Sequence, residues 1–334
     1  MLKKILILLL FFSGNYLKPQ TNLDSLNAIW QDQDRPDSTR VKAYKDYIWK
    51  GFLFSKPDTA FILAEELLVF WRNNNYLKAK ALGYKYQGIS WYVRGDFVNA
   101  LEYYMKSLKI EKDIGDLEEI NGSLNNIGLI YSDQGAYLKA LGYFTQSLKI
   151  AENVGDLDGV SSALSNIGII YIKLGDYSNA LDYSSRSLKI NEQIDDQYGV
   201  SLQLNNIGTI YNDQGDYYKA LDYYTRGLKI KEKIGDYIGI GITLNNIGDV
   251  YQALGDYPQA LEYYTQSLKT REQIGDQGRI AYSLNDVGNA YLKQHDYYKA
   301  IDYCQRGYEL AVAAGILELQ RNGCLCLYET YKAM

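Results

Sequence analysis

The chain has 334 residues and a net charge of −5, from 35 Lys and Arg against 40 Asp and Glu. With 29 Gly, 4 Pro, 47% hydrophobic and 22% charged residues, it has the composition of a folded protein, which excludes collagen-like and proline-rich disordered chains. The lack of basic runs argues against a nucleic-acid partner, and a single histidine excludes most histidine-dependent catalysis and zinc chemistry.

The N-terminal segment has the order of a secretory signal peptide. Lys3 and Lys4 precede an unbroken apolar run over residues 5–12, and polar residues follow from Ser13. The run is too short for a bilayer, which needs about 20 apolar residues, but it suits a signal peptide, which needs roughly 7–15. We predict a signal peptide over residues 1–20 with a weak cleavage region, and an exported protein, periplasmic or extracellular, without further membrane segments. An uncleaved amphiphilic anchor is the alternative.

Two segments precede the regular part of the chain. Ala60 and Leu68 lie 40 residues before Ala100 and Leu108, so residues 38–80 are expected to form a degenerate repeat. Residues 21–37 are expected to be a leader that caps this end. All four tryptophans lie between positions 30 and 91, where large apolar side chains would cover the open end of a stack.

From residue 81 to residue 320 the sequence repeats six times with a period of 40. Tyr recurs at 131, 171, 211, 251 and 291, and Ala at 100, 140, 180, 220, 260 and 300. Within one unit, apolar positions spaced three and four apart predict two successive helices. Gly135 and Gly155 stand where these helices would end in a left-handed turn. One such pair cannot bury enough surface alone, so neighbouring pairs must stack.

These features resemble the tetratricopeptide repeat. Gly128, Tyr131, Ala140 and an aromatic residue at 144 match its pattern, with Gly-Asp between helices. The 40-residue period and the Leu-Asn-Asn-Ile-Gly segment resemble the subtype found in kinesin light chains and in bacterial exported proteins. The resemblance implies an all-α fold, a right-handed solenoid of stacked antiparallel helix pairs. It also implies a concave groove, lined by the first helix of each pair, that binds a peptide or a protein.

Residues 321–334 match the first helix of a seventh unit. Leu327 aligns with Val287 and Tyr331 with Tyr291, but no second helix follows. This segment is expected to be a half repeat or a capping helix. Its apolar residues are unusual for a cap, which needs a polar outer face. The alternative is that the chain is the input part of a longer protein.

No pattern of residues indicates catalysis. The sequence has no nucleophile elbow, no phosphate-binding loop and no His-x-x-x-His, so we predict a protein that is not an enzyme and binds no cofactor or metal. His295 stands where other units have the turn glycine and should adopt a left-handed conformation. Cys304 replaces a core aromatic residue. Cys324 and Cys326 would point to different helix faces and make a poor metal pair, and a Cys304–Cys324 disulfide is geometrically possible.

Candidate binding residues come from mapping the resemblance onto the first helices. An asparagine ladder offers donors and acceptors at repeat spacing to an extended peptide backbone. The neighbouring column at 126, 166, 206 and 246 is interpreted as hydrogen bonding between helices. The predicted groove residues are Asn125, Asn205, Asn245, Asn285, Thr209, Asp249, Asn289, Asn212 and Tyr282.

Three functions fit the sequence. The first is a non-catalytic scaffold that binds a peptide or partner segment in the groove. The second is a sensory input module of a larger signalling protein, a histidine kinase or nucleotide cyclase, truncated at Met334. The third is capture of a carbohydrate or small ligand on tyrosine-rich faces, since the chain has 34 Tyr and each pair at 103–104, 223–224 and 263–264 would turn one ring outward.

Overall fold

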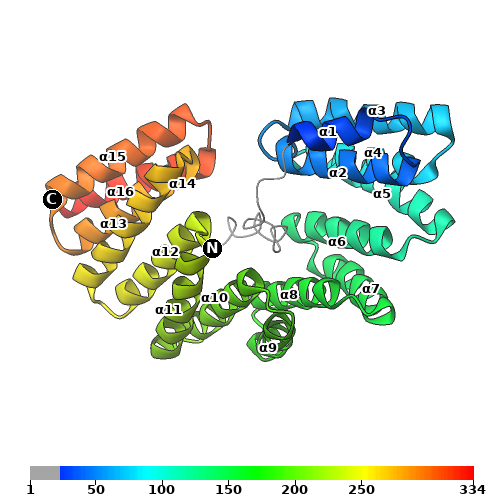
Figure 1. The fold of residues 1–334 in the computed structure, drawn as a ribbon. Helices are drawn as coiled ribbons and strands as arrows, with labels where there is room; N and C mark the ends of the chain where they lie inside the picture. Colours follow the sequence, from blue (N-terminus) through cyan, green and yellow to red (C-terminus); the bar gives the residue numbers. More distant parts are fainter. Residues whose placement is uncertain (1–22) are drawn as a thin grey trace. The chain divides into compact units, whose positions relative to one another are not determined.

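The computed structural model describes residues 23–334, which form sixteen helices and no strand (Figure 1). The predicted signal peptide therefore lies outside the described residues. The chain divides into two units, residues 1–190 and 191–334, and each is described by itself. Among the described helices, none combines the length and apolar character needed to cross a bilayer. The all-α helical-repeat architecture expected from the sequence is confirmed.

Each repeat is a pair of helices joined by a short turn. The helices of the first unit are α1 (Leu23–Gln31), α2 (Asp37–Gly51), α3 (Pro57–Asn74), α4 (Leu77–Val93), α5 (Phe97–Ile114), α6 (Leu117–Asp133), α7 (Tyr137–Val154) and α8 (Leu157–Leu174). Helix α9 (Tyr177–Gln193) begins in the first unit and ends in the second. The second unit continues with α10 (Gln197–Asp213), α11 (Tyr217–Ile234), α12 (Tyr237–Ala253), α13 (Tyr257–Ile274), α14 (Gln277–Lys293), α15 (Tyr297–Ala313) and α16 (Leu317–Ala333).

In the regular repeats, a glycine in the first helix brings the two paired helices into close contact. A Cβ atom placed at Gly208 would lie 2.7 Å from the ring of Tyr224, and one at Gly248 would lie 2.6 Å from the ring of Tyr264. Any larger residue would push the helices apart, because side chains in a protein core have no free space to move into. The glycine of the repeat therefore sets the distance between the paired helices.

The turns follow the sequence signals. Gly155 ends α7 with φ of 71°, a left-handed conformation that glycine adopts without a steric penalty. His295 takes the same role with φ of 61°, so its prediction as a turn residue is confirmed. Asp116 accepts a hydrogen bond from the backbone N–H of Glu119 and so caps α6.

Most of the tyrosines pack within the repeats. Tyr104, Tyr224 and Tyr264 are buried, as expected for the inward member of each pair. The outward rings do not stand alone: Tyr223 stacks on Tyr211 and Tyr263 on Tyr251, with centroids 5.5 and 5.4 Å apart. These stacked pairs hold the end of one helix against the start of the next, which accounts structurally for much of the tyrosine content.

The last helix is joined covalently to its neighbour. Cys304 on α15 and Cys326 on α16 form a disulfide with Cα atoms 5.9 Å apart, and Cys304 is fully buried as predicted. The pairing of Cys304 with Cys324 considered from the sequence is wrong. Cys324 is exposed and free, because it lies on a different side of α16 from Cys326.

We predict that Cys326→Ala destabilises the α15–α16 end by about 3 kcal/mol under oxidising conditions, because a bridge over 22 residues restricts the unfolded chain. Thermal unfolding with and without reductant measures the effect. Cys324→Ala is the matched control and should unfold like the natural chain. Peptide mapping that found Cys324 in the bridge would contradict the assignment.

Candidate functional site

The first helices leave one narrow face partly open to solvent in the second unit. In α12 the half-buried residues Ile242, Asn246 and Asp249 are spaced four and three apart and so lie along one side of the helix. We call the equivalent positions of three helices the open face. It consists of Leu202 and Thr209 of α10, Ile242, Asn246 and Asp249 of α12, and Tyr282, Asp286 and Asn289 of α14. Figure 1 shows these three helices following one another along the second unit.

The predicted asparagine ladder is buried in both units. Its members are at most 9% exposed, so the expectation that they line the groove is not met: they are Asn125, Asn205, Asn245 and Asn285. Two of these side chains, those of Asn125 and Asn205, instead join successive first helices. The Nδ2 of Asn166 donates to Oδ1 of Asn125 over 2.7 Å, and the Nδ2 of Asn246 donates to Oδ1 of Asn205 over 3.3 Å.

The donors of these two bonds, Asn166 and Asn246, belong to the neighbouring column, for which the sequence predicts hydrogen bonding between helices. The acceptors are residues of the ladder. Asn125 and Asn205 are therefore structural, whereas the buried amide of Asn285 has no hydrogen-bond partner among the described residues. Two adjacent asparagines in a helix point about 100° apart, so a sequence alone does not decide which of the two meets the neighbouring helix.

Thr209 and Asp249 lie on the open face, and both already contact the hydroxyl of a buried tyrosine. The hydroxyl of Tyr224 lies 3.0 Å from Oγ1 of Thr209, and the hydroxyl of Tyr264 donates to Oδ1 of Asp249 over 2.7 Å. A hydrogen-bond partner for a buried hydroxyl stabilises the fold, because a buried hydroxyl without a partner costs about 1–3 kcal/mol of folding free energy. The polar character of these two positions thus has a structural reason besides any ligand.

Tyr282 belongs to an ionic cluster on α13 and α14 that the sequence analysis missed. The carboxylate of Asp286 and burial raise the pKa of Tyr282 above its usual value. Burial, and then the carboxylate of Asp249, raise the pKa of Asp286. The guanidinium of Arg271 lies 5.6 Å from the ring centroid of Tyr282 and donates to Oγ of Ser283 over 2.6 Å. Asn289 and Asn212 are half-buried, so both remain accessible.

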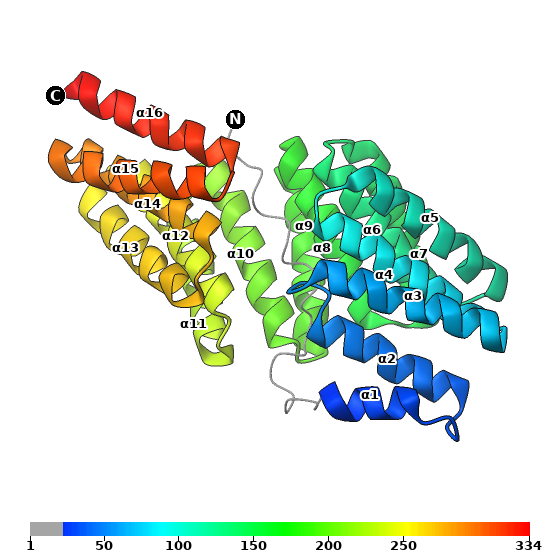
Figure 2. The same cartoon turned by 90° about the horizontal axis from the view of Figure 1, so that it is seen from above.

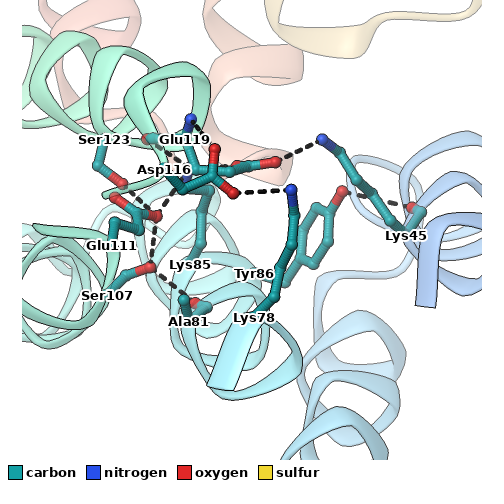
Figure 3. Close-up of polar contacts among 10 residues, drawn as sticks. All are labelled: Lys45, Lys78, Ala81, Lys85, Tyr86, Ser107, Glu111, Asp116, Glu119 and Ser123. Atoms are coloured by element: carbon teal, nitrogen blue, oxygen red, sulfur yellow. Dashed lines mark hydrogen bonds and ion pairs between the residues drawn. The ribbon is translucent and has the colours of Figure 1, made fainter. Parts of the chain in front are cut away.

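The first unit holds a second ionic cluster, shown in Figure 3. Nζ of Lys85 lies 2.6 Å from Oε2 of Glu119 and 2.9 Å from Oε1 of Glu111. Lys45 of α2 reaches the other oxygen of Glu119 over 2.8 Å. One carboxylate thus links three first helices, α2, α4 and α6.

Hydroxyl groups and a flanking ion pair complete this cluster. Ser107 and Ser123 donate to Glu111 over 2.8 and 3.0 Å, and Lys78 pairs with Asp116 over 2.7 Å. Lys85 and Glu111 are buried, so neither is open to a substrate.

Electrostatics explain why this cluster stays charged. Burial raises the pKa of Glu119, but the ammonium groups of Lys85 and Lys45 outweigh burial and lower the pKa to about 2. A sequence signal was present: Lys45 and Lys85 lie 80 and 40 residues before Asn125, in the same register. The charges therefore continue the asparagine ladder towards the N-terminal end of the first unit.

No metal site accompanies these clusters. Within residues 23–334, no group of three or more His, Cys, Asp or Glu is arranged to hold a metal ion. The buried lysine of the second unit, Lys231, donates to the carbonyl of Ser201 over 3.1 Å, and burial lowers its pKa to about 8. Its side chain is 2% exposed, so it offers no surface for chemistry.

Two family models of the tetratricopeptide repeat match the sequence. One matches residues 119–193 and 201–273, and the other matches residues 245–313. Together they cover more than half of the chain. The chain belongs to the tetratricopeptide repeat (TPR) family. No curated protein sequence matches this TPR protein.

Solved structures share the fold. BtubC (BKLC) from P. vanneervenii is 20% identical, with a TM-score of 0.55 over 71% of this chain and 93% of that one. NprR in complex with its cognate peptide NprX is 19% identical, with a TM-score of 0.56 over 87% of this chain and 82% of that one. A STAND protein with a TPR sensor, PH0952 from Pyrococcus horikoshii, is 18% identical, with a TM-score of 0.62 over 96% of this chain. The TPR protein spans 53% of that longer chain.

We predict that Glu119 makes stability depend on acid pH. Its pKa is about 2 in the fold against 4.5 as a free side chain, so its contribution is complete above about pH 5 and is lost as pH falls toward 2. Glu119→Gln leaves two lysines facing a neutral amide and should cost about 3 kcal/mol at neutral pH.

Urea unfolding between pH 2 and 7 measures this effect, and the variant should show a flatter dependence below about pH 5. Glu102→Gln is the control, because Glu102 forms an exposed pair with Lys106 at 2.7 Å. Equal losses in the two variants would show that the cluster does not stabilise the fold.

Proposed function

We propose that this TPR protein is a non-catalytic interaction scaffold that binds an extended peptide or partner segment on the open face. The observation that best supports this proposal is the regular order of side chains along the open face. Leu202, Ile242 and Tyr282 occupy one register in three successive repeats, and a polar residue follows seven positions later in each. An extended segment presents side chains and backbone groups at regular intervals, which suits such a repeating surface.

The fold neighbours support the peptide-binding proposal. NprR was solved with its cognate peptide NprX, and a Rap protein, 14% identical with a TM-score of 0.58, was solved with Competence and Sporulation Factor. The acceptor groups of the open face indicate which ligands suit it. Asp249 and Asp286 both lie on it, so a segment rich in N–H donors is favoured over an acidic one.

We predict that Ile242→Ala with Asn289→Ala weakens binding of a selected peptide by at least about tenfold, because both side chains would contact it. The peptides come from a random display library selected on the natural protein, and fluorescence anisotropy measures affinity. Gln266→Ala with Lys269→Ala, on the exposed side of α13, should leave affinity unchanged. Equal affinity for both double variants, with unchanged thermal unfolding, would mean that the peptide binds elsewhere.

We also propose that the protein is exported. Lys3 and Lys4 followed by the apolar run over residues 5–12 support a signal peptide. The Cys304–Cys326 disulfide supports the same compartment, because such bridges persist chiefly in oxidising environments.

A second candidate function is the sensory module of a larger signalling protein. The exposed apolar residues of α16 favour it, because a following domain would cover them: they include Leu325, Tyr328 and Tyr331. Immunoblotting of the native protein separates the two functions. We predict a band slightly below 38.1 kDa for the exported scaffold. A much larger band would favour the sensory module, and a cytoplasmic location would contradict export.

A further inference from the structure

Helix α16 is packed on one side only. Its buried residues form a single stripe directed at the preceding helices, namely Leu319, Gly323, Cys326 and Thr330. On the other side, Leu325, Tyr328 and Tyr331 are 56%, 60% and 62% exposed. Figure 2 shows α16 lying along α15 at the edge of the second unit. The open side of α16 thus carries large apolar side chains that no described element covers.

A second helix of the usual kind does not fit on this side. Position 328 corresponds to Gly208, Gly248 and Gly288, the residues that let a second helix approach. A Cβ at Gly248 would already lie 2.6 Å from the ring of Tyr264, so a whole tyrosine side chain there prevents this packing. The occupant of the α16 surface must therefore differ from the second helix of a seventh repeat.

The charges on this side are arranged symmetrically about Leu325. Arg321 lies four residues before it and Glu329 four residues after it, while Glu318 lies seven before and Lys332 seven after. With about 100° per residue, all four lie within roughly 40° of Leu325 around the helix. Arg321 and Glu329 are exposed and about 12 Å apart along the axis, too far to pair within one helix.

We propose that this side of α16 binds a second copy of the same chain, with the two α16 helices antiparallel and related by a twofold axis at Leu325. In that arrangement Arg321 of each copy lies opposite Glu329 of the other, and Glu318 opposite Lys332. Leu325 and Tyr328 form the apolar centre. A twofold interface uses the same surface on both copies, so each pairing occurs twice and the surface must be complementary to itself. The sign pattern around Leu325 meets this requirement.

Sedimentation equilibrium of the full mature chain tests the proposal. We expect a dimer whose dissociation depends on concentration and increases with salt, because exposed ion pairs are screened. Arg321→Glu places like charges opposite each other and should weaken the dimer at least tenfold. Arg306→Glu is the control, because Arg306 lies on α15 and pairs with Asp302 at 3.3 Å. It should leave dimerisation unchanged.

A charge exchange separates specific pairing from a general effect of charge. Arg321→Glu combined with Glu329→Arg restores complementarity between copies and should recover most of the lost affinity. Circular dichroism confirms that each variant is folded. A natural chain that stays monomeric up to about 1 mM overturns the proposal, as does a double variant no better than Arg321→Glu. Peptide affinity on the open face is a separate readout, so failure of dimerisation and failure of the proposed function are distinguishable.

Discussion

The close contact between a glycine of the first helix and a ring of the second is the constraint on which each repeat depends. It sets how near the paired helices lie, as at Gly208 with Tyr224 and Gly248 with Tyr264. The pairs at Gly168 and Gly288 are exceptions, because Ser184 and Cys304 replace the ring, and the buried hydroxyl of Ser184 has no hydrogen-bond partner among the described residues. These two pairs therefore lack the ring packing that stabilises the others.

At two repeats the ring of the second helix also bears on the open face. There the second helix contributes a tyrosine whose hydroxyl reaches the residue after the glycine, Thr209 in one repeat and Asp249 in the other. Where it contributes Phe144, which has no hydroxyl, the corresponding residue is Leu129, and both are buried. The polar character of Thr209 and Asp249 thus has a reason in the core beneath them and is not by itself a sign of a ligand. The coupling is not general, because Ile89 follows Gly88 although the ring there is Tyr104.

Contacts between successive first helices include buried polar groups. Asn125 and Asn205 accept hydrogen bonds from the next first helix, and at the N-terminal end Lys45 and Lys85 occupy the same register and meet Glu119. Buried hydrogen bonds and ion pairs require fixed geometry, so they determine how one repeat lies on the next. On the open face, the positions that remain for binding a partner include Ile242 and Tyr282.

The sequence alone determined the period of 40, the helix pairs, the turn residues Gly155 and His295, and the all-α class, because spacing and turn chemistry are local properties. The burial of Asn125, the Cys304–Cys326 bridge and the convergence of Lys45 and Lys85 on Glu119 appeared only in the tertiary structure. Each depends on which side of a helix meets its neighbour, and a rotation of about 100° between adjacent residues decides that.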